Sequence, residues 1–201
     1  MIANHLKLAF RNLVKKKFIS FTNVIGLATG MAVCILISMW IWDEISFDRY
    51  HTNYESIAKV RMNVTRSGEI STTKTVPLPL VHELETNFND DFRHIVPSSH
   101  KAHHIIGYSQ ARLFKKGVYL GSQAPAMLSL KMIRGDVSAL EERRSIILRK
   151  STAQALFGDD DPLNEVVTLD NMENVKVTGV YEDLPQNTSF ADVEFICPFD
   201  L

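Results

Sequence analysis

The chain has few cysteines and no sequence signature of an enzyme. Its 201 residues include two cysteines, Cys34 and Cys197, which are far apart, so a disulfide framework is excluded. We expect Cys34 to be a small packing residue and Cys197 to be a buried thiol. No phosphate-binding loop of the form GxxxxGK followed by Ser or Thr occurs, and Ser145, Ser151 and Ser189 stand in no nucleophile elbow. The sequence therefore offers nothing to support a nucleotide hydrolase or a serine hydrolase.

Standard metal-binding motifs are also missing, although four histidines lie within eleven residues, at His94, His100, His103 and His104. No nearby cysteine or carboxylate completes a zinc or copper spacing, and the adjacent His103 and His104 would point to opposite faces of a strand. The acidic run Asp159–Asp161 lacks the pattern of an EF-hand loop and is better explained as a solvated turn. We therefore expect no metal and no other cofactor, and keep a histidine metal site as the less favoured alternative.

Charge is absent from Phe18 to Trp42, a run of 25 positions. At about 1.5 Å per residue, a helix of this length crosses the roughly 30 Å hydrocarbon core of a bilayer with room for tilt. The sequence thus predicts a membrane helix over residues 18–42, with Trp40 and Trp42 at the outer interface. A cleaved signal peptide is the main alternative, but its apolar region is normally shorter, and here Asp43 and Glu44 follow instead of a small-residue cleavage site.

The charges that flank this run predict its orientation. The first 17 residues include five basic residues and no acidic one. The other 17 basic residues and all 23 acidic residues lie in residues 18–201. Under the positive-inside rule, Lys15, Lys16 and Lys17 set the topology, which makes residues 1–17 a cytoplasmic leader and places residues 43–201 outside. The leader also has an apolar row at helical spacing and could lie on the lipid surface. That row consists of Leu6, Phe10, Leu13 and Val14.

Within the predicted membrane helix, Gly26 and Gly30 form a GxxxG pair. Small residues at this spacing allow another helix to approach closely. The pair could also be without consequence, because glycine is common in membrane helices. We favour a role in packing against partner helices.

Residues 43–201 mix strand and helix signals without a strict βαβ repeat, which predicts an α+β domain. Alternating or apolar residues predict strands at 58–64, 95–96, 105–106, 118–120, 146–148, 166–169 and 175–181, with Gly107 and Gly117 as breaks. The turn at Asp170 and Asn171 should join the last two strands into a hairpin. Residues 58–64 would place a sheet directly after the membrane helix.

Two helices are predicted in the same region. The first begins at Pro79, and Leu80, Leu84 and Phe88 give it an apolar face that should pack on the sheet. The second opens with a capping box made by Ser151 and Gln154, and it ends at Gly158.

Several short motifs occur in a fixed order along the chain. They are LAFRNL at 8–13, NVIGL at 23–27, FDRYH at 47–51, LFG at 156–158 with DP at 161–162, and VTGVY at 177–181 with DLP at 183–185. Together they resemble the MacB-like and FtsX-like permeases of ABC transporters, over the first membrane helix and the start of the periplasmic core domain. Asn164 departs from the glycine usual in this family, but asparagine tolerates positive φ, so the turn should survive.

This resemblance implies a permease subunit that performs no chemistry. A separate cytoplasmic ATPase would hydrolyse ATP. The permease would carry the resulting conformational change across the bacterial inner membrane to its periplasmic domain. The transporter would export or extract a substrate that the sequence does not identify. The residues that would couple helix to domain are Trp40, Trp42, Phe47, Asp48 and Tyr50. The expected partners are the ATPase, membrane lipid and a second permease unit. Alternatively, a second half of the full-length chain would take the place of that unit and form a pseudo-dimer. No nucleic acid is expected.

The family has at least four membrane spans, so we expect this chain to be an N-terminal fragment with an incomplete periplasmic domain. The alternative function is a membrane-anchored sensory or ligand-binding domain without a transport role. Further apolar spans in the reading frame beyond Leu201 would favour the permease, and a stop codon there would favour the anchored domain.

Overall fold

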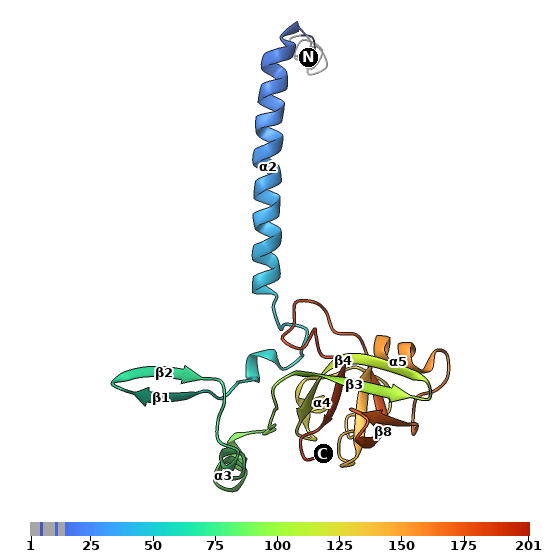
Figure 1. Cartoon of the computed structure of the whole chain (residues 1–201). Coiled ribbons are helices and arrows are strands. Elements are labelled where there is room, and N and C mark those ends of the chain that lie inside the picture. Colours follow the sequence, from blue (N-terminus) through green and yellow to red (C-terminus); the bar gives the residue numbers. More distant parts are fainter. Residues whose placement is uncertain (1–4, 6–10, 12–14) are drawn as a thin grey trace. The chain divides into compact units, whose positions relative to one another are not determined.

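The computed structural model describes residues 5, 11 and 15–201. The chain forms two compact units, Met1–Phe47 and Asp48–Leu201. The first unit contains helix α2, Lys17–Ile45, whose 29 residues include the whole predicted apolar run (Figure 1). The apolar row of the leader and the LAFRNL motif lie outside the described residues, apart from Arg11.

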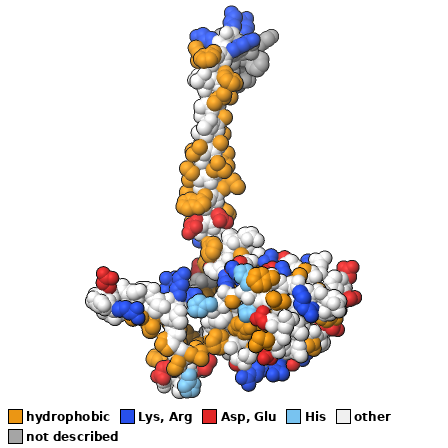
Figure 2. Space-filling view, in the orientation of Figure 1, with side chains coloured by type: hydrophobic (Ala, Val, Ile, Leu, Met, Phe, Trp, Pro, Cys, Tyr) orange, Lys and Arg blue, Asp and Glu red, His pale blue; other side chains and the backbone are white. Residues whose placement is uncertain are grey.

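Helix α2 has no buried residue, and hydrophobic side chains cover its surface along most of its length (Figure 2). Within residues 5, 11 and 15–201, it is the one helix long and apolar enough to cross a membrane. It extends three residues beyond the predicted end at Trp42, because Asp43 and Glu44 continue the helical backbone where the apolar run has ended.

The second unit is built on a seven-stranded sheet in the order β5-β8-β6-β9-β4-β3-β7. Strand β7 pairs with β3 on one side and with β8 on the other, so the sheet closes on itself into a small barrel. Most pairs are antiparallel, but β4 with β9 and β6 with β8 are parallel. The strands are β3 Ala102–Tyr108, β4 Ala111–Leu120, β5 Met132–Arg134, β6 Ser145–Arg149, β7 Val166–Leu169, β8 Glu173–Tyr181 and β9 Phe195–Pro198. The predicted α+β class is confirmed.

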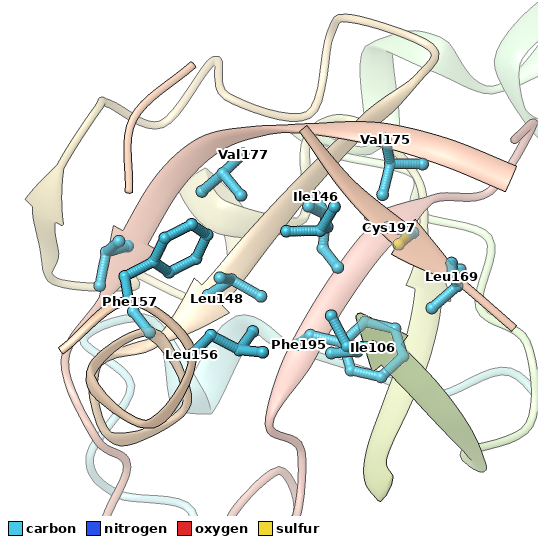
Figure 3. Packing of buried hydrophobic residues seen from close by; sticks show 13 residues of the cluster. Ile106, Ile146, Leu148, Leu156, Phe157, Leu169, Val175, Val177, Phe195 and Cys197 are labelled. Carbon is cyan, nitrogen blue, oxygen red and sulfur yellow. The ribbon is translucent and has the colours of Figure 1, made fainter. Parts of the chain in front are cut away.

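Alternating residues of the strands enter two separate cores, one on each face of the sheet. Ile146 and Leu148 belong to the first core and Ile147 to the second, and all three are fully buried. Such a split follows from the two-residue period of a strand. Figure 3 shows the first core, which fills the barrel, with Phe195 and Ile106 packed against each other.

Helices and connections complete the two cores. Helix α5, Lys150–Phe157, adds Leu156 and Phe157 to the core inside the barrel (Figure 3). Helix α4, Ala124–Met127, contributes Ala124 to the second core, on the outer face of the sheet.

The predicted hairpin between the strands at 166–169 and 175–181 is confirmed. Asp170 and Asn171 have φ of 54° and 55°, as the two central residues of a type I′ turn require, and they lie in a three-residue loop because Leu169 pairs with Glu173. Asn164 has a φ of 67°, so it does adopt the conformation expected where the family has glycine. Burial of Cys197 at 0 % exposure is likewise confirmed.

Several strand predictions need correction. Strand β1, Met62–Arg66, begins four residues later than expected, and it pairs with β2, Glu69–Thr73, in a separate two-stranded sheet. Residues 95–96 form no strand. Gly107 and Gly117 do not break strands but lie inside β3 and β4. A Cβ at Gly117 would overlap the ring of Phe195, so this glycine is required by packing inside the barrel.

The two predicted helices form, but each differs in one respect. Helix α3, Pro79–Asn87, begins at its proline, yet it has no buried residue, so the predicted packing on the sheet is wrong. Helix α5 ends at Gly158 as predicted, with a φ of 63°. Its start is not a capping box, because the amide of Ser151 donates to the Asp183 carboxylate at 3.0 Å. A residue distant in the sequence thus supplies the cap.

Candidate functional site

The candidate site is the start of the second unit, where residues 48–51 form what we call the anchor segment. Asp48 has a φ of 59°, a conformation that aspartate tolerates because its side chain can bond locally. Its carboxylate accepts hydrogen bonds of 2.5 Å from both the amide and the hydroxyl of Ser189. Its own amide donates to the carbonyl of Asn187 at 2.8 Å. Three bonds therefore tie this residue to a segment far along the chain.

His51 provides the second attachment of the anchor segment. Its side chain is buried, at 3 % exposure, and Nδ1 lies 2.6 Å from the carbonyl oxygen of Leu128. A carbonyl can only accept, so Nδ1 carries the proton. In the described structure Nε2 is buried without a hydrogen-bond partner.

Tyr50 packs beside His51 against the outer core of the sheet. The two rings meet edge to face, with centroids 5.5 Å apart. The ammonium of Lys131 lies 5.4 Å from the centre of the Tyr50 ring, a distance typical of a cation–π contact. Burial raises the pKa of Tyr50, although the Lys131 charge opposes that rise.

Asp48 is bound to the connection between β8 and β9, residues 182–194, which we call the strap. Side chains from the barrel hold the strap along its length. The Lys101 ammonium donates to the Ser189 carbonyl and to the Asp192 carboxylate, both at 2.5 Å. Arg149 donates to the carbonyl of Ala191 at 3.0 Å. Phe190 packs against the outer core. The anchor segment is therefore fixed to a connection that the barrel itself holds.

The charged end of the strap forms an ion-pair network with β4. Lys116 pairs with Asp192 at 2.9 Å, and Lys115 pairs with Glu194 at 2.6 Å. Partial burial raises the pKa of Asp192, but hydrogen bonds from Lys101 and Lys116 outweigh it and hold this pKa at about 2. Asp192 is therefore ionised at neutral pH and remains paired.

The structure brings together only part of the residue set predicted for coupling. Asp48 and Tyr50 lie in the anchor segment, whereas Phe47 belongs to the first unit, as do Trp40 and Trp42 in α2. The other predicted positions also lie in the first unit: Lys15, Lys16, Lys17, Gly26 and Gly30. A Cβ at Gly26 or Gly30 would meet nothing within 4 Å, so both remain open to a partner helix. Their roles remain predictions.

Three of the four histidines considered as metal ligands have other contacts. His94 lies 3.1 Å from the Gln123 side-chain oxygen, and His104 lies 2.6 Å from the Asp170 carboxylate. The His103 ring stacks on Phe114, with centroids 4.9 Å apart, on the opposite side of β3 from His104. Among the residues that the structure describes, no three His, Cys, Asp or Glu side chains are grouped to hold a metal.

No sequence pattern points to the partners of the anchor segment. Ser189 lies 141 residues from Asp48 and stands in no motif that points to it. The burial of His51 had one available signal, its place in the FDRYH motif.

Comparisons with known proteins place these features in a family. The model of the MacB-like periplasmic core domain matches residues 20–201. No curated protein matches the chain.

Solved structures of similar proteins include the periplasmic region of MacB from Actinobacillus actinomycetemcomitans. That structure is 17 % identical, with a TM-score of 0.49, over 63 % of this chain and 56 % of that one. The extracellular domain of the noncanonic ABC-type transporter YknZ from Gram-positive bacteria is 20 % identical, with a TM-score of 0.47, over 61 % of this chain and 62 % of that one. This chain thus spans less than two thirds of either structure. The family match covers nearly the whole sequence, and on that ground the chain belongs to the MacB-like periplasmic core domain family.

Proposed function

We propose that this chain is part of the permease subunit of an ABC transporter. Helix α2 would cross the inner membrane, with its N-terminus in the cytoplasm and Asp48–Leu201 in the periplasm. Three features support this topology: the length of the uncharged run in α2, the basic residues Lys15, Lys16 and Lys17 before it, and the acidic Asp43 and Glu44 after it. Membrane lipid would then be in direct contact with the exposed surface of α2.

The role we propose is mechanical: the chain passes a conformational change from a cytoplasmic ATPase to the periplasmic domain. We assign ATP hydrolysis to a separate subunit, because this chain has no phosphate-loop sequence. The substrate would be exported or extracted by the assembled transporter, which we expect to contain two permease units or two halves of one longer chain.

The observation that carries this proposal is the attachment of Asp48 to the strap. Asp48 directly follows the first unit in the chain, and its three hydrogen bonds reach Asn187 and Ser189. A displacement that arrives through the backbone at residue 48 would therefore pass to the strap. From the strap it would continue into β8 and β9 and, through Asp183, to the start of α5. A flexible tether would absorb such a displacement.

The first test is affinity purification of the tagged full-length gene product from crosslinked native membranes, followed by mass spectrometry. We expect a cytoplasmic ATPase with a phosphate loop to accompany it. An intact, membrane-inserted bait that brings no ATPase would favour the alternative, an anchored sensory or ligand-binding domain.

The second test examines the mechanical role. Hydrogen exchange of the strap would be measured in the purified complex with and without a non-hydrolysable ATP analogue. We expect nucleotide to change exchange at residues 185–194 in the natural protein, and we expect Asp48→Ala to abolish that change while the ATPase still co-purifies. Asp160→Ala, in an exposed turn, is the matched control and should leave the response intact. An unchanged response in Asp48→Ala would contradict the proposed route.

A further inference from the structure

Ser189 of the strap is held on two sides, by the anchor segment and by the barrel. Its amide and hydroxyl donate to the Asp48 carboxylate, whereas its carbonyl oxygen accepts a hydrogen bond from the Lys101 ammonium at 2.5 Å. Lys101 directly precedes β3, so the anchor segment and the barrel bind the same residue of the strap. The mechanical role proposed above uses the first of these contacts and not the second.

The Lys101 side chain has little freedom to move. Its ammonium also donates to the Asp192 carboxylate at 2.5 Å, and it lies 5.4 Å from the centre of the Phe190 ring, a distance typical of a cation–π contact. A lysine side chain is otherwise flexible and samples many rotamers in water. Because three neighbouring residues of the strap hold this one, a displacement of the strap moves the ammonium with it.

The backbone on both sides of Lys101 is bonded to β4. Two positions before it, the amide of Ser99 donates to the Tyr119 carbonyl at 2.9 Å, and the Tyr119 amide donates to Ser99 Oγ at 3.0 Å. Directly after it, Ala102 pairs with Gly117 in the β3–β4 register. The base of the lysine therefore shifts only together with these two strands, which lie side by side (Figure 1).

Asp192 extends the contact of the strap to the second strand. One of its carboxylate oxygens accepts a hydrogen bond from Lys101 at 2.5 Å, and the other accepts one from Lys116 of β4 at 2.9 Å. Lys116 is the register partner of His103 in β3. Hydrogen bonds between charged groups are stronger than those between neutral ones. A single carboxylate of the strap thus joins two neighbouring strands.

Strands β3 and β4 are joined to each other more extensively than to their neighbours. Seven register pairs connect β3 with β4, whereas two connect β3 with β7 and four connect β4 with β9. We call residues 102–120 the β3–β4 hairpin. A displacement applied at Lys101 should therefore move both strands of this hairpin together.

We propose that Lys101 is a positioning residue that passes a displacement of the strap to the β3–β4 hairpin. The route runs from Asp48 through Ser189 to Lys101, and Asp192 divides it between the two strands. This inference rests on the mechanical role proposed above, because it describes where the movement of the strap goes next. Without the Lys101 ammonium, the strap still follows Asp48 but moves relative to the hairpin.

Hydrogen exchange of the β3–β4 hairpin tests this route in the purified full-length complex. In the natural protein we expect a non-hydrolysable ATP analogue to change exchange in residues 185–194 and in residues 102–120. Lys101→Met keeps a long side chain but removes the donors, so the strap should still respond while the response of the hairpin falls about fivefold. Lys101→Arg, which keeps a cation, should recover most of it.

Two further variants accompany this measurement. Asp192→Asn is a milder change on the same route and should reduce the response of the hairpin about twofold. Lys176→Met is the matched control, because the Lys176 side chain is 35 % exposed, against 30 % for Lys101, and pairs with Glu142 outside the route. It should leave the responses of the strap and of the hairpin unchanged.

A double-mutant cycle measures the same connection without nucleotide. Exchange of the Ala191 and Val193 amides, which are hydrogen-bonded within the strap, would be compared in full-length Asp48→Ala, Lys101→Met and the double variant. If both residues act through Ser189, the two increases in exchange rate should not multiply. With about tenfold for each single variant, we expect about twentyfold for the double variant and not about a hundredfold.

The outcomes separate this inference from the proposed function. An unchanged response of the hairpin in Lys101→Met, with the strap still responding, contradicts the role of Lys101 alone. A natural protein whose strap does not respond to nucleotide contradicts the mechanical role, and the cycle then decides the connection by itself. Exchange rates that multiply overturn it, because Asp48 and Lys101 are then independent attachments of the strap.

Discussion

Asp48 and Ser189 are joined by two hydrogen bonds across 141 positions of sequence, with one carboxylate receiving both the amide and the hydroxyl of the serine. Removal of the carboxylate leaves the amide and the hydroxyl of Ser189 without this acceptor. Because hydrogen bonds to a charged group contribute about 1.5–3 kcal/mol, we expect Asp48→Ala to lower the free energy of unfolding by about 2 kcal/mol. Urea denaturation measures the change.

Substitutions at the same pair act as controls for that prediction. Ser189→Ala retains the amide donor and should cost about 1 kcal/mol, and Asp48→Asn, which retains one acceptor oxygen, should cost less than Asp48→Ala. Equal stability of Asp48→Ala and the natural protein would show that the pair does not secure the anchor segment.

Gly117 faces the ring of Phe195 inside the barrel, where no room exists for a Cβ. We expect Gly117→Ala to lower the free energy of unfolding by at least about 2 kcal/mol, because the closed strands cannot move apart to relieve the overlap. Thermal unfolding followed by circular dichroism would report it. Combination with Phe195→Leu should recover part of the loss. Ser71→Ala, on the exposed β2, should change stability by no more than about 0.5 kcal/mol.

The ion pairs of Asp192 predict a loss of stability in acid. Its pKa is about 2 in the folded chain and 3.8 in the reference state, so folding favours the ionised carboxylate. The contribution of this carboxylate to the free energy of unfolding is complete above pH 4 and disappears as the pH falls towards 2. With the side chain 47 % exposed, solvent screening limits it to about 1 kcal/mol. Unfolding scans from pH 6 to 2 should show a smaller acid-dependent loss in Asp192→Asn; an identical pH profile would contradict the assignment.

Cys197 should react only when the barrel opens. Burial raises the pKa of its thiol, and the side chain is 0 % exposed, so the reactive thiolate is scarce and shielded. In the Cys34→Ser protein we expect no maleimide labelling under native conditions and full labelling in urea, with a midpoint that matches the loss of ellipticity. Rapid labelling of the native protein would mean that β9 separates from its neighbours in the folded state.

The glycine pair of α2 predicts an effect on assembly and not on the periplasmic domain. Gly26→Ile with Gly30→Ile should prevent close approach of another helix and reduce recovery of partner subunits in detergent. Protease resistance of Asp48–Leu201 should be unaffected, since neither glycine belongs to that unit. The control is Leu27→Ile with Met31→Ile, which keeps the glycines. Unchanged recovery in the glycine variant would remove the packing role.

Local chemistry made much of the fold predictable. The uncharged run predicts α2 to within a few residues, Asp170 and Asn171 predict the β7–β8 hairpin, and Gly158 marks the end of α5. In each of these cases the residues that decide the structure are neighbours in the sequence.

Features that depend on distant partners could not be predicted. Barrel closure needs β7 to pair with both β3 and β8, and no pattern within β7 distinguishes one partner from two. Gly117 looked like a strand break because the ring it accommodates belongs to β9. Asp48 was predicted as a coupling residue from the family motif, but its acceptor role depends on Ser189, which carries no signal of its own.

Because Asp183 caps α5, we expect the helices and strands around it to form in a definite order during folding. The helix begins directly after β6. The carboxylate that accepts the hydrogen bond of its Ser151 amide belongs to the strap, which follows β8, and β8 must pair with β6 before this carboxylate is in position. An eight-residue helix is too short to be stable alone in water, so we expect it to form late. In pulsed hydrogen-exchange labelling during refolding, the Ser151 amide should gain protection after the amides of β6 and β8.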